Sequence, residues 1–164
     1  MEMIGLKPRS IAWVLPHYLA IGERPGGSGT THRRIRREEE VCWLEKQEFG
    51  AVISLLPTTH NLQAYDEVGI DAIHLPMAPD EVDEKLPAIF EVLDDYVVNR
   101  HEKVYLHGED VDDLVVGICG AYLLHIGAVP DLPTAVATIE RVTSRPLGNS
   151  GRAIVASEEI GTRA

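Results

Sequence analysis

Cysteine is scarce in this chain, and its scarcity excludes one class of fold. The 164 residues contain only two cysteines, Cys42 and Cys119. Two cysteines do not make the disulfide framework on which small secreted domains depend. Both lie in segments with a helical pattern, where a lone cysteine usually packs as a small buried hydrophobe. An apolar core must therefore hold the fold, and a chain of this length can form one.

Positive charge is also scarce. The sequence has 15 Lys and Arg against 26 Asp and Glu, which gives a formal net charge of -11 at pH 7. An acidic protein repels the phosphate backbone of nucleic acids and the surface of an anionic membrane. We therefore expect neither nucleic acid nor a membrane as the partner.

Long apolar runs are missing as well. The longest one, residues 114–129, is interrupted by glycines and His125 and is too short to span a bilayer comfortably. Residues 1–10 show no apolar region of the kind that a secretory signal contains. We expect a cytoplasmic protein.

Short apolar runs alternate with helical patterns along the chain. The runs predict strands at residues 11–15, 18–21, 51–56, 70–75 and 103–107. Helical patterns follow at residues 31–50, 83–97, 113–127 and 133–144. This order predicts an α/β fold: one domain over residues 11–157, with a central, mostly parallel sheet flanked by helices on both faces. Residues 1–10 and 158–164 are expected to be short terminal extensions.

One stretch, residues 103–124, contains the central strand, loop and helix around which the other predicted elements are arranged. It is typical of a buried strand, a tight loop and a helix that is apolar on nearly every side. Such a loop directs backbone N–H groups into a pocket at the positive end of the helix dipole. That geometry favours an anion, usually phosphate.

The loop His107–Val115 resembles the signature loop of the cysteine-dependent tyrosine and dual-specificity phosphatases, whose pattern is H-C-x5-R-[ST]. The strand, His107 and the buried helix match this pattern, but Gly108 occupies the cysteine position, Leu114 the arginine position and Val115 the hydroxyl position. The resemblance implies the tyrosine-phosphatase fold, with His107 organising the loop by hydrogen bonding. It also assigns the vestigial general-acid position to Asp80.

The altered loop lacks the groups that phosphatase chemistry needs. No Cys, Ser or Thr stands between His107 and Gly117, so the loop offers no nucleophile. Leu114 cannot hold a phosphate as an arginine does, and Asp80 then has nothing to protonate. We expect no catalytic residue in the degenerate loop, which comprises His107, Gly108, Glu109, Asp110, Val111, Asp112, Asp113 and Leu114.

Four acids in this loop admit two interpretations. Glu109, Asp110, Asp112 and Asp113 can be solvated or can cap the helix, where a carboxylate contributes about 0.3–1 kcal/mol. Clustered carboxylates also suit Mg²⁺ or Ca²⁺. The sequence favours capping, because no complete ligand spacing is present. We therefore predict no cofactor and keep the four acids as weaker candidates for a metal site.

These observations predict a catalytically inactive phosphatase-like protein that acts as a binding or regulatory module, with another protein as its partner. The alternative is a hydrolase that cleaves a phosphate ester by metal-assisted chemistry through residues 109–113. A structural or dimer-forming subunit is a third possibility. The basic segment 32–37 is interpreted as a solvated face, with a docking patch for an acidic or phosphorylated partner as its alternative.

Overall fold

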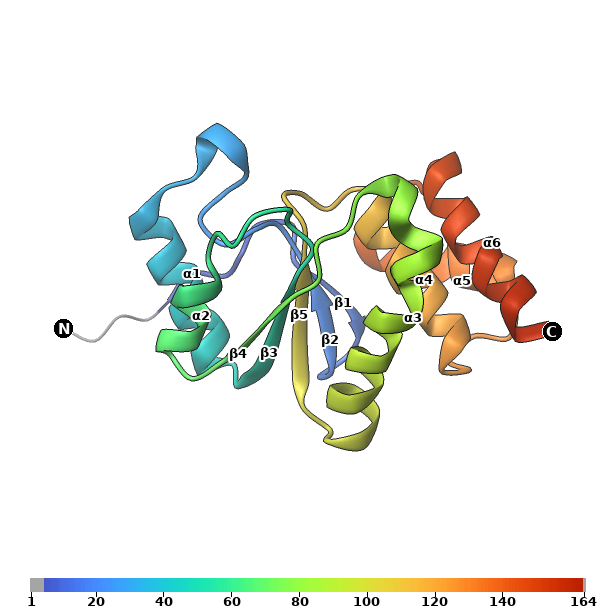
Figure 1. Ribbon diagram of the computed structural model, residues 1–164, viewed down its shortest axis with the longest axis horizontal. Coiled ribbons are helices and arrows are strands. Elements are labelled where there is room, and N and C mark those ends of the chain that lie inside the picture. The colour runs from blue at the N-terminus through green and yellow to red at the C-terminus, as the bar shows by residue number, and fades with distance from the viewer. Residues whose placement is uncertain (1–4, 164) are drawn as a thin grey trace.

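A five-stranded sheet lies at the centre of the molecule (Figure 1). The computed structural model describes residues 5–163, and the side chains of residues 5–158. The strand order is β1-β2-β5-β3-β4, in which β1 pairs with β2 antiparallel and the other neighbours are parallel. The strands are β1 (Ala12–Leu15), β2 (Leu19–Ile21), β3 (Phe49–Ser54), β4 (Asp71–His74) and β5 (Lys103–His107).

Helices cover both faces of the sheet, as Figure 1 shows. One face carries α1 (Arg34–Lys46) and α2 (Leu62–Glu67), and the other carries α3 (Val82–Leu93), α4 (Asp113–His125), α5 (Leu132–Thr143) and α6 (Asn149–Arg163). Short 3-10 turns lie at Gly29–Thr31 and Pro79–Glu81, and a π-helical segment, Asp94–Asn99, prolongs α3. The predicted α/β class is confirmed. Helix α6 continues past residue 157, where the sequence placed the end of the domain.

The central strand β5 and the helix α4 that follows it are the most buried elements. Val104, Tyr105 and Leu106 are fully buried, because β5 lies between β2 and β3 and under helices on both faces. Helix α4 is buried from Val115 to Leu124 between α5 and α6. The strand and helix that flank the loop are thus held from every side.

The predicted start of α1 is wrong. Thr31 does not cap the helix; it ends a 3-10 turn in which its hydroxyl donates to the carbonyl of Ser28 at 2.6 Å, and the helix begins at Arg34. Its end is also earlier than predicted, because Phe49 begins β3. There the Phe49 ring packs against Trp13 and Trp43, with ring centroids 5.7 and 6.0 Å apart.

The basic segment 32–37 is only partly a solvated face. Arg34 forms an exposed pair with Glu38 at 3.1 Å, as that interpretation requires. Arg36, however, pairs with Glu40 of α1, which is fully buried. Burial raises the pKa of the Glu40 carboxyl, and the Arg36 guanidinium opposes that rise. The Arg36 side chain is therefore mostly buried, with 13% of it exposed.

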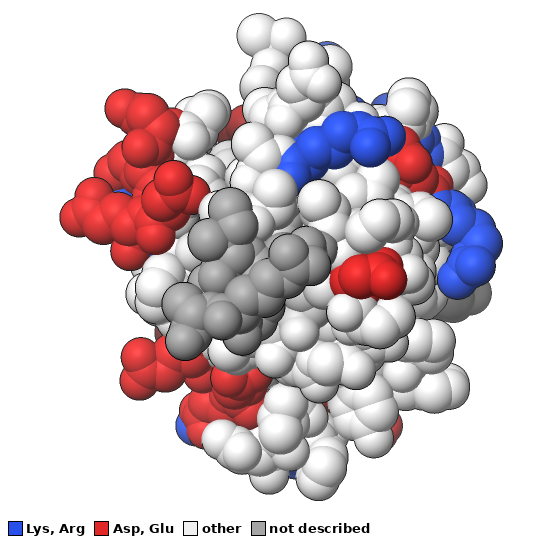
Figure 2. Space-filling model, turned by 90° about the vertical axis from the view of Figure 1, so that its right-hand side faces the viewer, with Lys and Arg blue, Asp and Glu red and all other residues white. Residues whose placement is uncertain are grey.

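Acidic side chains are unevenly distributed on one face of the molecule. Figure 2 shows the face over α5 and α6, on which acidic residues gather toward one edge while most of the face is uncharged. Within residues 5–163, no helix combines the length and apolar character that crossing a membrane requires.

Candidate functional site

Several loops meet at one edge of the sheet. Strands β2, β3, β4 and β5 run parallel, so the segments that follow them all emerge at their carboxyl ends. Ligands of open α/β sheets bind at this edge. The degenerate loop (residues 107–114), which follows β5, therefore lies where the fold positions a functional site.

His107 is buried at the base of this loop. Its Nε2 lies 2.8 Å from the Tyr65 hydroxyl and its Nδ1 lies 2.8 Å from the carbonyl of Gly108. Burial lowers the pKa of His107 to about 4, so the imidazole is neutral near pH 7. A neutral ring whose Nδ1–H donates to the carbonyl of Gly108 accepts a hydrogen bond from the Tyr65 hydroxyl at Nε2. His107 thus connects the loop to α2.

Gly108 leaves space for a side chain. A Cβ at this position would meet the Cγ2 atom of Val115 at 3.4 Å, an ordinary van der Waals contact, and the backbone is not left-handed. Nothing in the local geometry requires glycine here. Leu114 is half-buried and packs against the apolar core between the sheet and helices α3 to α6, and Val115 is fully buried. Neither side chain offers a charge or a hydroxyl to an anion.

Glu109 binds the glycine-rich segment that follows β2. Its Oε2 accepts from the backbone N–H of Gly29 at 3.0 Å, and its Oε1 lies 3.4 Å from Nη1 of Arg24. The backbone N–H of Arg24 also donates to the carbonyl of Glu109 at 3.2 Å. These three contacts attach residues 22–31 to the degenerate loop.

Asp112 is the N-cap of α4. Its side chain accepts from the backbone N–H of Val115 at 3.1 Å, and its carbonyl accepts from Val116 at 3.0 Å. A carboxylate there satisfies a helix N–H group and interacts favourably with the helix dipole.

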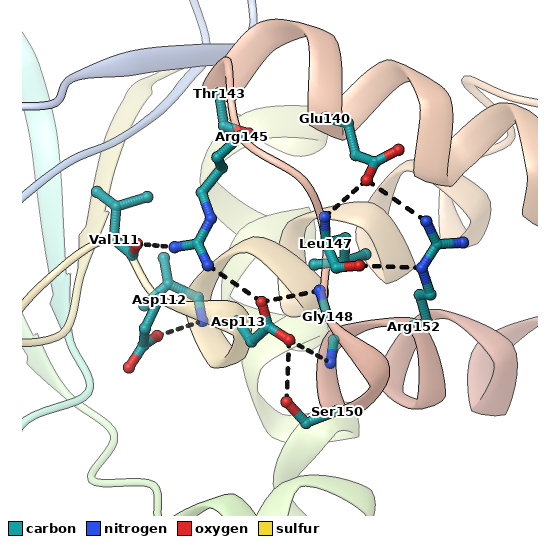
Figure 3. Close-up of polar contacts among 12 residues, drawn as sticks. Val111, Asp112, Asp113, Glu140, Thr143, Arg145, Leu147, Gly148, Ser150 and Arg152 are labelled. Atoms are coloured by element: carbon teal, nitrogen blue, oxygen red, sulfur yellow. Dashed lines mark hydrogen bonds and ion pairs between the residues drawn. The ribbon is translucent and has the colours of Figure 1, made fainter.

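Asp113 joins α4 to the start of α6 (Figure 3). Its carboxylate accepts from the backbone N–H groups of Gly148 and Gly151, both at 3.1 Å, and from the Ser150 hydroxyl at 3.0 Å. Arg145 adds a contact at 3.2 Å and also donates to the carbonyl of Val111. Burial alone would raise the pKa of Asp113, but these donors together outweigh it and lower that pKa.

The four acids therefore point in different directions. Glu109, Asp112 and Asp113 have separate structural partners, and Asp110 is exposed. Within the described part of the chain, no group of three or more His, Cys, Asp or Glu side chains is arranged to hold a metal ion. This arrangement supports the capping interpretation for Asp112.

Asp80 lies in the short turn before α3 and is exposed. It lines a cavity of about 480 Å³ together with Leu114, Asp112 and Asp113. The position that the resemblance assigns to the general acid thus faces the degenerate loop. Carboxylates on both sides of this cavity repel a dianion.

Comparison with known proteins identifies the fold. No protein-family model and no curated protein sequence matches the chain. A solved structure of kinase associated phosphatase, with its catalytic-site cysteine substituted by serine, matches with a TM-score of 0.74 at 15% identity over 96% of this chain and 98% of that one. Human DUSP28 matches with a TM-score of 0.72 at 13% identity over 98% and 99%. The human tyrosine phosphatase-like serine/threonine/tyrosine-interacting protein matches with 0.68 at 15% over 94% and 98%.

The chain has the protein tyrosine phosphatase fold. The resemblance drawn from the loop is thereby confirmed at the level of fold. In this fold the degenerate loop lies at the carboxyl end of β5.

Two arginines of the site were missed. Arg24 contacts Glu109 from the segment after β2, which is rich in glycine and proline. Arg145 contacts both Val111 and Asp113 from the segment that joins α5 to α6. Each contact joins residues that are more than 30 positions apart, so no local pattern could have predicted it.

Proposed function

We propose that this protein is a catalytically inactive member of the phosphatase fold that acts as a binding or regulatory module for another protein. The observation that carries the proposal is the joint loss of the nucleophile at Gly108 and the phosphate-holding cation at Leu114 in a loop that keeps its strand, its histidine and its helix. The proposal retains the cytoplasmic location expected from the sequence.

The contacts of the loop support this proposal. Covalent phosphoryl transfer requires a nucleophile at the end of β5, and the nearest cysteine in the sequence, Cys119, is fully buried within α4, where burial raises the pKa of its thiol. The loop carboxylates are engaged in helix capping and loop attachment rather than gathered around one point. A fold that preserves this framework without its reactive groups is suited to recognition.

One structural neighbour is consistent with such a role. The human protein with a TM-score of 0.68 is described as tyrosine phosphatase-like and as interacting. The likeness itself concerns the fold alone, so the recognition role of the present chain is our proposal.

Restoring the missing groups tests the proposal. The variant that combines Gly108→Cys, Leu114→Arg and Val115→Ser places a thiol where a Cβ already has room. We expect wild-type protein to show no hydrolysis of an aryl phosphate and the triple variant to exceed it by at least about a hundredfold. The matched control carries Gly108→Ser in place of Gly108→Cys and should stay inactive. Hydrolysis by the wild type at a rate equal to that of the triple variant would contradict the proposal.

A further inference from the structure

Two buried guanidinium Nε atoms in the described residues, those of Arg24 and Arg37, lack a hydrogen-bond partner, and they lie in one cluster with His32 and Asn61. We call these residues the arginine cluster. Arg24 and Asn61 are 94% and 95% buried, since their exposed fractions are 6% and 5%. Leaving a buried polar group unpaired is unfavourable, by about 1–3 kcal/mol for a neutral group and more for a charged one.

The cluster is compact although its members are distant in sequence. Arg24 follows β2, His32 and Arg37 flank the start of α1, and Asn61 precedes α2. A Cβ added to Gly26 would lie 2.5 Å from Nε2 of His32 and 2.8 Å from Cβ of Arg37, so both side chains pack on the same glycine. Asn61 donates to the carbonyl of Pro25 at 2.8 Å, which brings α2 against the same turn.

Positive charge dominates the cluster. Burial lowers the pKa of His32, the charges of Arg24 and Arg37 lower it further, and a hydrogen bond with Asn61 opposes that fall. The carboxylate beside Arg24 is Glu109, at the long distance of 3.4 Å. The neighbouring acids Glu23 and Glu40 both contact Arg36 instead.

We propose that the arginine cluster is a binding site for a phosphate-sized oxyanion, either free phosphate or a phosphate monoester. An oxyanion accepts several N–H groups at once, which is what unpaired guanidinium donors on two elements require. The site lies beside the degenerate loop rather than in it. It is independent of catalysis, because binding needs no nucleophile.

Glu109 is the internal competitor of this ligand. Its carboxylate contacts Arg24 and the backbone N–H of Gly29, and so occupies one side of the Arg24 guanidinium. On the side of the cluster formed by Arg37 and Asn61, a groove of about 580 Å³ between α1 and α2 gives access from solvent. A bound dianion would displace the carboxylate of Glu109 from Arg24.

Calorimetric titration with inorganic phosphate, and separately with phenyl phosphate, tests the proposal. We expect the wild type to bind, Arg24→Gln and Arg37→Gln each to weaken binding by about tenfold, and Glu109→Gln to strengthen it several-fold by removing the competitor. Arg141→Gln, on an exposed position of α5, is the matched control and should bind as the wild type does. Equal affinity for the two ligands would identify free phosphate, and tighter binding of phenyl phosphate would identify a monoester.

Absence of phosphate binding in both the wild type and Glu109→Gln would overturn the proposal. So would equal weakening by Arg141→Gln, because binding would then follow net charge rather than the cluster. If circular dichroism shows that Arg24→Gln does not fold, the affinities of Arg37→Gln and Glu109→Gln for phosphate test the proposal. Release of phenol, measured in parallel, reports on the proposed inactivity, so the two proposals can fail separately.

Discussion

Replacing Asp113 by alanine should destabilise the protein markedly, because this carboxylate connects two helices. It accepts hydrogen bonds from two backbone N–H groups and the Ser150 hydroxyl, and it pairs with Arg145. A hydrogen bond to a charged group contributes about 1.5–3 kcal/mol when well shielded. The Asp113 side chain is 21% exposed, and the freed donors can reach water. We therefore expect a total loss of about 2–3 kcal/mol.

The assay is thermal and urea unfolding followed by circular dichroism. For a chain of this length the expected loss lowers the melting temperature by about 5–10 °C. Asp110→Ala is the matched control, since Asp110 is an exposed acid in the same loop and its loss should change stability by less than about 0.5 kcal/mol.

The pH dependence of this effect has a defined sign. The pKa of Asp113 is lower in the folded protein than its ordinary value of 3.8. Its contribution is therefore complete above pH 3.8 and is lost as the pH falls below that value. The stability difference between the wild type and Asp113→Ala should shrink at pH 3. Equal stabilities of Asp113→Ala and Asp110→Ala at pH 7 would refute the structural role of Asp113.

Two further predictions follow from buried groups of the same region. The pKa of His107 falls from 6.5 to about 4 on folding, so the free energy of unfolding should fall by up to about 3 kcal/mol as the pH is lowered from 7 to 4. In urea unfolding at both pH values, His107→Gln should lose this part of the pH dependence of stability. Gly117→Ala should destabilise the protein by about 1–3 kcal/mol, although alanine favours a helix, because the new Cβ would lie 3.0 Å from Cα of Gly151 in α6. A melting temperature at or above that of the wild type would disprove this close packing of helices.

Much of the fold follows from apolar patterning. The buried run in β3 and the helical face of α3, which includes Leu86, Ile89 and Leu93, gave the correct element types because burial fixes their periodicity. The ends of α1 did not follow. Thr31 offers a capping hydroxyl but uses it in a preceding turn, and Phe49 has its place in β3 through contacts with two tryptophans.

The site was predictable only in part. The spacing around His107 placed the degenerate loop, because a strand, a loop and a buried helix leave a local signature. The partners of its acids were not predictable, since Glu109 meets Arg24 and Asp113 meets Gly148 only after the chain has folded. The contacts that determine the chemistry of the loop therefore join residues that are distant in sequence and meet only in the folded protein.

The central claim is that the degenerate loop does not catalyse phosphate ester hydrolysis. The most direct measurement is turnover of an aryl phosphate by purified wild-type protein, with a chelator and then with millimolar Mg²⁺ or Mn²⁺. Our account predicts no turnover in any of these conditions. Metal-dependent turnover that disappears in Asp112→Ala or Asp113→Ala would contradict it and would make the acidic loop an active site.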